Sequence, residues 1–232
     1  MIPINLKVLL VKNIPNAITL ANLAAGFGSI KLTFSGDYYP AVVLVIAAMI
    51  LDYLDGKAAR ALGAESNMGK QLDSLSDLVS FGMAPAALCL GVVTSGGLWM
   101  VVILLVFLFS GVYRLARFNL KDREETKYFR GFPLTTAGVL LAVLTLYTAW
   151  LPFWFYYLLI LVLALSMVSR LPYYSFKANG ISRSCEVVLL VVMAAVVAAS
   201  FFFPYILAVV LGLYYLSGLL LFAAFRLLRV GS

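Results

Sequence analysis

The sequence has no histidine and only two cysteines, and both scarcities restrict its chemistry. With no His among 232 residues, the chain has no imidazole for acid–base catalysis and no ordinary set of zinc ligands. Cys89 and Cys185 both lie inside apolar stretches, which is typical of core packing rather than of a disulfide or a ligand pair. Any metal in this protein must therefore be held by oxygen atoms.

Charged residues are also scarce. Only 12% of the chain is charged and 64% is hydrophobic, with a mean hydropathy of +1.04, whereas a soluble domain is about 45–50% apolar and about 25% charged. These values predict a polytopic membrane protein and exclude a nuclear factor, a secreted disulfide scaffold and a cytosolic enzyme. On such a protein a net charge of +7 indicates topology, and we expect no nucleic acid as partner.

The length of the uncharged stretches sets the number of membrane spans, since a helix of about 20 residues crosses about 30 Å of hydrocarbon. The stretches are Ile14 to Ile30, Tyr38 to Leu51 continued through Asp52, Leu78 to Tyr113, Gly131 to Ser169, and Val187 to Phe225. The last three are long enough for two helices each, and they are interrupted at Thr94–Gly97, Pro152 and Pro204. The sequence thus predicts an all-α membrane bundle of eight transmembrane helices, or six or seven if one hairpin is re-entrant.

The positive charges give the orientation. With eight spans, every Lys and Arg except Lys31 lies on the same side as both termini, and this side is cytoplasmic by the positive-inside rule. The chain is expected to be one domain over residues 1–232. Its N-terminal segment, residues 1–13, is predicted to be an amphipathic helix on the inner surface or else a disordered tail. It is not a signal peptide, because the apolar run Val8 to Val11 is too short.

Four aspartates are expected at one depth near the cytoplasmic side. Asp52 and Asp55 close the second span at spacing i, i+3, and Asp73 and Asp77 open the third at spacing i, i+4, so each pair shares a helix face. Four such carboxylates need counter-charge, and hard oxygen ligands favour Mg²⁺, Mn²⁺ or Ca²⁺. Two bridged metal ions are a known device for phosphoryl chemistry. The alternative is a set of solvated helix-end charges or N-caps.

The residues around the aspartates fit a phosphate ligand. Gly56 and Ala59 leave room beside the first pair, and Arg60 and Lys70 supply positive charge that would balance a pyrophosphate. Gly69 precedes the third span, where a bend or a close approach is expected. Taken alone, each glycine is equally explained by helix packing or by a turn.

These residues carry a resemblance to a known family. The segment from Asp52 to Asp77 matches the pattern D-x-x-D-G-x-x-A-R-x8-G-x-x-x-D-x-x-x-D at all eight fixed positions, and it resembles the signature of the CDP-alcohol phosphatidyltransferases. The resemblance implies a six-helix core (residues 14–183) and a divalent-metal site of the four Asp. It also implies transfer of a phosphatidyl group from a CDP-lipid to an alcohol, release of CMP, and a homodimer. Asp77 would be the general base, and residues 184–232 would form an added hairpin.

Further segments narrow the resemblance to the membrane-bound phosphatidylserine synthases. They are Ile14–Gly26, Gly69–Ala86, Arg114–Asn119 and Phe129–Pro133. The acceptor implied is L-serine, which reacts with CDP-diacylglycerol. Its carboxylate suits an arginine, and Arg114, Arg117 and Arg130 are candidates, although each is also explained as a membrane anchor.

The remaining expectations concern the donor and the competing functions. Asn16 and Thr19 open the first span and would bind the nucleotide or cap the helix. The CDP-lipid would lie at the cytoplasmic interface, with two Mg²⁺ or Mn²⁺ ions on its pyrophosphate. Two alternatives stay open. One is a relative with another acceptor or lipid, such as glycerol 3-phosphate, inositol phosphate, or serine with an archaeal ether lipid. The other is a cation transporter.

Overall fold

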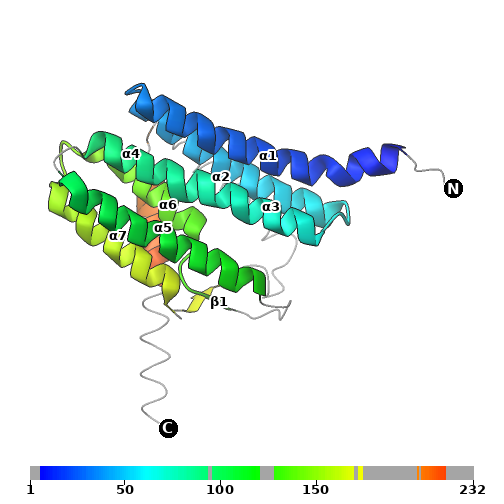
Figure 1. Ribbon diagram of the computed structural model, residues 1–232. Helices are drawn as coiled ribbons and strands as arrows, with labels where there is room; N and C mark the ends of the chain where they lie inside the picture. The colour runs from blue at the N-terminus through cyan, green and yellow to red at the C-terminus, as the bar shows by residue number, and fades with distance from the viewer. Residues whose placement is uncertain are drawn as a thin grey trace, which may run out of the picture.

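The described part of the protein is a bundle of apolar helices with one short pair of strands. The computed structural model describes residues 6–93, 96–120, 128–169, 172–174, 203 and 205–217. In chain order the elements are α1 (Leu6–Phe34), α2 (Tyr38–Ala61), α3 (Asn67–Asp77), the π-helical η1 (Leu78–Met83), α4 (Ala84–Val92), α5 (Gly97–Leu120), β1 (Tyr128–Arg130), α6 (Leu134–Leu144), the 3₁₀ turn η3 (Thr145–Tyr147), α7 (Phe153–Val168) and β2 (Pro172–Tyr174). One more helix, Tyr205–Ser217, is unlabelled and orange in Figure 1.

The helices pack in two layers around α6 (Figure 1). α1 lies along α2 and against α3, α5 lies along α7, and α6 contacts α2, α4 and η1 between them. The core is built from large buried side chains such as Phe81, Phe107 and Tyr156. Equally large apolar side chains, including Trp99 and Phe109, stay exposed on the outer faces. Such faces suit lipid rather than water.

The helix lengths confirm a multi-pass membrane protein. Among the described residues, three helical stretches are long and apolar enough to cross a membrane, and three further apolar helices are shorter. The long stretches are Asn13–Phe34, Asn67–Val92 and Gly97–Leu120, and the short helices are Leu134–Tyr147, Phe153–Val168 and Tyr205–Ser217. The expected eight crossings and the orientation of the termini stay predictions.

Most of the predicted breaks between helices are confirmed. The break at Thr94–Gly97 separates α4 from α5, and Pro152 immediately precedes α7. Of the last predicted hairpin, the structure describes the helix after Pro204. The predicted boundary between the six-helix core and the added hairpin, between residues 183 and 184, lies outside the described residues. The N-terminal segment is helical from Leu6 and continues directly into the first span. The strand pair was not predicted, and it aligns Tyr128 with Tyr174.

Pro85 explains the π-helical segment in the middle of the third predicted span. Proline has no N–H, so the carbonyl of Phe81, four residues earlier, loses its usual α-helical donor. The preceding N–H, that of Ala84, instead donates to the carbonyl of Val79, five residues back. The helix therefore widens between α3 and α4, directly after the predicted catalytic aspartate.

Two glycines let neighbouring helices pack closely on this widened segment. A Cβ on Gly138 of α6 would overlap the carbonyl of Phe81, with its carbon only 2.7 Å away. A Cβ on Gly26 of α1 would lie 2.7 Å from Cα of Ser80. Neither neighbour is a flexible side-chain end, so only glycine fits at these two contacts. The segment after Asp77 is thus fixed against both α1 and α6.

Candidate active site

Three of the four predicted carboxylates meet where α2 faces α3. Asp52 and Asp55 extend from α2 and Asp73 from α3, and one oxygen of each lies within 4.8 Å of the others. Over the part of the chain that the structure describes, none of them forms an ion pair, and Oδ1 of Asp73 is buried without a hydrogen-bond partner. Hard oxygen donors at this spacing, with an unpaired oxygen among them, fit a divalent cation.

Two threonines form hydrogen bonds to carboxylates of this cluster. The Thr19 hydroxyl lies 2.6 Å from Oδ2 of Asp55 and 3.0 Å from the carbonyl oxygen of Pro15. Thr135 of α6 donates to Oδ2 of Asp52 at 3.4 Å. Second-layer hydrogen bonds of this kind orient carboxylate ligands. Thr19, predicted to bind nucleotide or cap a helix, thus contacts a carboxylate. Thr135 was missed, because only the packing of α6 on α2 brings it there.

Asp77 lies one helical turn beyond Asp73 and has its own partner. It is 8% exposed, and the amide of Asn22, which is fully buried, donates to its Oδ1 at 3.4 Å. The Ser80 hydroxyl donates to the main-chain carbonyl of Asn22 at 3.0 Å, which ties η1 to α1. Asn22 was not predicted as a site residue. Its position three residues after Thr19, on the same face of α1, is the signal that could have identified it.

The predicted diphosphate-binding residues on α2 lie beside Asp55. The Arg60 side chain is exposed and folds back over Gly56, where a Cβ would lie 3.3 Å from one guanidinium nitrogen. Arg60 is within electrostatic range of Asp55. Ala59 is half-buried in the same turn. A flexible cation at the open edge of an acidic cluster can bind a phosphate that approaches from solvent.

Gly69 allows the start of α3 to approach α1. Its N–H donates to the hydroxyl of the N-cap Ser66 at 3.0 Å, and a Cβ here would lie 3.2 Å from Oδ1 of Asn16. The expected close approach is therefore present. Lys70, in contrast, donates to the carbonyl of Asn119 at 3.1 Å. Its charge stabilises the C-terminus of α5 rather than lying free beside the aspartates.

Arg114 of α5 lies next to the acidic cluster. It is half-buried, and both Asp77 and Asp52 are within electrostatic range of its guanidinium. Its Nε is buried, and within the described ranges it makes no hydrogen bond. A guanidinium has five donors in a fork that suits a carboxylate or a phosphate. Arg114 therefore has hydrogen-bond donors near the cluster that make no hydrogen bond within the described residues.

Arg117, one turn further on, has a different environment. It donates to the main-chain carbonyls of Met167, Val168 and Ser169 at 3.3, 3.0 and 3.3 Å, at the C-terminus of α7. These bonds satisfy carbonyls that the helix end leaves without donors. The backbone of Arg130 lies in β1, and its side chain is outside the described part. The structure therefore distinguishes two arginines that the sequence treats alike.

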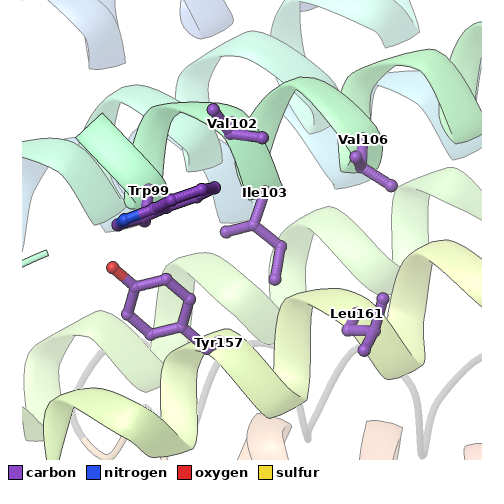
Figure 2. Close-up of a pocket in the computed structure, with 6 residues that line it drawn as sticks. All are labelled: Trp99, Val102, Ile103, Val106, Tyr157 and Leu161. Carbon is purple, nitrogen blue, oxygen red and sulfur yellow. The ribbon is translucent and has the colours of Figure 1, made fainter. Parts of the chain in front are cut away.

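An apolar groove between α5 and α7 offers no comparable chemistry (Figure 2). It is lined by Trp99, Val102, Ile103, Val106, Tyr157 and Leu161. These α5 residues lie in the first half of that helix, whereas Arg114 lies in its second half. Among the residues that the structure describes, no carboxylate or basic side chain lines the groove.

Comparison with known proteins identifies the family. A model of the CDP-alcohol phosphatidyltransferase family matches residues 12–168, which is more than half of the chain. The chain is 34% identical over 225 residues to the CDP-diacylglycerol–serine O-phosphatidyltransferase of Mycobacterium leprae, covering 92% of this chain and 73% of that protein. It is 35% identical over 133 residues to the Bacillus subtilis protein of that name, covering 57% and 75%. The Saccharomyces cerevisiae protein is 40% identical over 136 residues, covering 51% and 48%. The chain belongs to the CDP-alcohol phosphatidyltransferase family.

Proposed function

We propose that this protein transfers the phosphatidyl group of CDP-diacylglycerol to the hydroxyl of L-serine, giving phosphatidylserine and CMP. The observation that carries the proposal is the cluster of Asp52, Asp55 and Asp73 within 4.8 Å, with Asp77 one turn away and Arg114 beside it. The serine acceptor is supported by the names of the relatives, which are CDP-diacylglycerol–serine O-phosphatidyltransferases in bacteria and in yeast.

The four aspartates are the proposed ligands of one or two Mg²⁺ or Mn²⁺ ions. When bound, such ions supply positive charge that stabilises the phosphoryl oxygens and the leaving group. The contribution of the chain is to hold the ligands in place. Thr19 and Thr135 donate to Oδ2 of Asp55 and to Oδ2 of Asp52, and these hydrogen bonds orient the two carboxylates.

Asp77 is the proposed general base. Its carboxylate accepts the proton of the serine hydroxyl, and the serine oxygen forms a bond to the phosphorus on the lipid side of the diphosphate. The bond from that phosphorus to the bridging oxygen breaks, and CMP leaves with the electron pair. Asn22 donates to one oxygen of Asp77 and so leaves the other available for the proton.

The CDP-lipid is proposed to bind across the starts of α1 and α3 and the end of α2. Arg60 is placed to contact the diphosphate, with Gly56 and Ala59 leaving space beside it. Asn16 and Gly69 form the nearby contact of α1 with α3, where the nucleotide would bind. Thr19 and Lys70 support the donor site indirectly, through Asp55 and through the end of α5.

Arg114 is the proposed partner of the serine carboxylate. Of the two candidate arginines whose side chains the structure describes, Arg114 is the one with a buried, unpaired Nε, and Asp77 is within its electrostatic range. The proposed reaction site is at the cytoplasmic face of the cell membrane, where a membrane-bound donor meets a water-soluble acceptor. A homodimer, suggested by the family, stays a prediction.

The test is CMP release by purified protein in detergent, supplied with CDP-diacylglycerol and Mn²⁺ or Mg²⁺. L-Serine, glycerol 3-phosphate and inositol phosphate are compared as acceptors, with and without EDTA. Asp73→Asn tests the cluster, and Asp37→Asn, an exposed acid on the turn before α2, is the matched control. We expect release with serine that EDTA and Asp73→Asn abolish and that Asp37→Asn preserves.

Other outcomes are equally informative. Release with another acceptor only would refute serine transfer while keeping the metal site. The absence of CMP release with every acceptor would refute the proposed reaction and would favour the alternative hypothesis of a cation transporter. Activity that survives both EDTA and Asp73→Asn would refute the metal-assisted mechanism.

A further inference from the structure

The helix Tyr205–Ser217 lies outside the family match, yet it packs beside the site. The match ends at residue 168, whereas Leu207 of this helix is 3% exposed in the core. In Figure 1 the helix passes behind α5 and α7. The Tyr215 hydroxyl lies 2.9 Å from the Ser166 hydroxyl, and its ring meets the Phe132 ring edge-on at 5.1 Å between centroids. The helix is thereby fixed to α7 and to the start of α6.

The preceding residue, Tyr214, forms a second aromatic contact between this helix and Phe132. Its ring centroid lies 6.1 Å from that of Phe132, three residues before the Thr135 that donates to Asp52. Tyr214 is half-buried and within electrostatic range of the Arg114 guanidinium. The turn of α5 that carries Arg114 packs on the chain around Phe132, since a Cβ on Gly111 would lie 2.9 Å from Cδ1 of Leu134 and one on Gly131 would lie 2.7 Å from an Arg117 guanidinium nitrogen. Arg114 is therefore near both the carboxylates of the cluster and the phenol of Tyr214.

From this arrangement we infer that Tyr214 and Arg114 together bind the carboxylate of the acceptor, so that the helix Tyr205–Ser217 forms one wall of the acceptor subsite. The inference rests on the proposed transfer to serine. A carboxylate has two oxygens, and it can accept from the guanidinium with one and from a phenolic O–H with the other. A half-buried guanidinium whose buried Nε has no hydrogen-bond partner among the described residues gains from an anion that arrives with the substrate. Tyr214 is thus a specificity-determining residue.

The experiment compares two acceptors on the same protein. L-Serine carries the carboxylate, and serinol (2-amino-1,3-propanediol) replaces it with a hydroxymethyl group while keeping the attacking hydroxyl and the ammonium. The ratio of kcat/KM for serine to that for serinol reports contact with the carboxylate. Because both rates come from one preparation, the ratio does not depend on the fraction of folded protein. Tyr214→Phe is the test variant, and Tyr215→Phe, which loses the hydroxyl of the same helix that contacts Ser166, is the matched control.

We expect Tyr214→Phe to lower the ratio about 10- to 100-fold, the effect of one hydrogen bond to a charged group. KM for serine should rise, while KM for CDP-diacylglycerol should not change. Tyr215→Phe should leave the ratio within about twofold of the wild type, and Arg114→Lys should lower it as Tyr214→Phe does. A ratio that Tyr214→Phe changes no more than Tyr215→Phe would overturn the inference alone. A wild-type protein that is inactive with serine but active with glycerol 3-phosphate would instead overturn the proposed function.

Discussion

Replacing Gly26 by alanine should displace Asn22, which lies one helical turn away on α1, and so disturb Asp77, the proposed general base. Gly26 lies four residues after Asn22 on the same face of α1, where that helix packs on Ser80 of η1. Asn22 in turn donates to Asp77. Gly28, two residues further along α1, is the matched control, since a Cβ there meets only the terminal Cδ1 of Leu44, at 3.0 Å.

The size of the effect follows from the packing distances. An alanine Cβ at position 26 would lie 2.7 Å from Cα of Ser80 and ordinary contact begins near 3.4 Å, so α1 and η1 must separate by at least about 0.7 Å. The bond from Asn22 to Asp77 is already 3.4 Å long, and such a shift takes it beyond hydrogen-bonding distance. Overpacking of this kind costs about 1–3 kcal/mol of stability, and misplacing a catalytic group by about 1 Å lowers kcat by up to about 100-fold.

Two measurements test this reasoning. Both glycine-to-alanine replacements gain the same helix preference of about 0.5–1 kcal/mol, so the difference between the variants isolates the packing effect. Serine-dependent CMP release should fall about 10- to 100-fold in Gly26→Ala and little in Gly28→Ala. Thermal unfolding in detergent should show a lower midpoint for Gly26→Ala alone. If Gly26→Ala kept both kcat and the midpoint within error of Gly28→Ala, the proposed coupling of helix packing to Asp77 would be refuted.

Three other variants test single residues of the site. Asp77→Asn should abolish CMP release while it keeps most binding of CDP-diacylglycerol, measured by displacement of a labelled nucleotide, and wild-type turnover would exclude Asp77 as base. Thr19→Val should raise the Mn²⁺ concentration for half-maximal activity about 10- to 100-fold with wild-type kcat at saturating Mn²⁺, whereas an unchanged Mn²⁺ dependence would show that Thr19 does not support the metal ligands. Arg117→Ala should lower the unfolding temperature without changing KM for serine, because its guanidinium caps α7. A raised KM with unchanged stability would instead place Arg117 in the acceptor site.

The acidic cluster was predictable because helix periodicity is a local property. Spacings of three and four residues place Asp52 with Asp55, and Asp73 with Asp77, on shared faces wherever the chain is helical. A short connection then brings the two pairs together, with oxygens of Asp52, Asp55 and Asp73 within 4.8 Å of one another. The same reasoning predicted the breaks near Gly97 and Pro152, since glycine and proline act on their own backbone.

The remaining partners of the site depend on contacts between distant parts of the chain. Thr135 approaches Asp52 across 83 positions, and Asn22 approaches Asp77 across 55. No periodicity within one helix encodes such a distance. The two arginines of α5 show the same limit. Arg114 and Arg117 are one turn apart in a basic motif, but only the position of α7 turns Arg117 into a helix cap.

The sequence by itself determined the class of protein, the helix breaks and the four carboxylates, because hydropathy, backbone restriction and helical spacing act over a few residues. The tertiary structure decided which side chains orient those carboxylates and which arginine stays available. It also decided that Pro85 widens the helix after Asp77, and that glycines at positions 26 and 138 admit the widened segment. The physical reason is that a side chain in a bundle acquires its partner from the helix packed against it, and helix packing is decided by the whole chain at once.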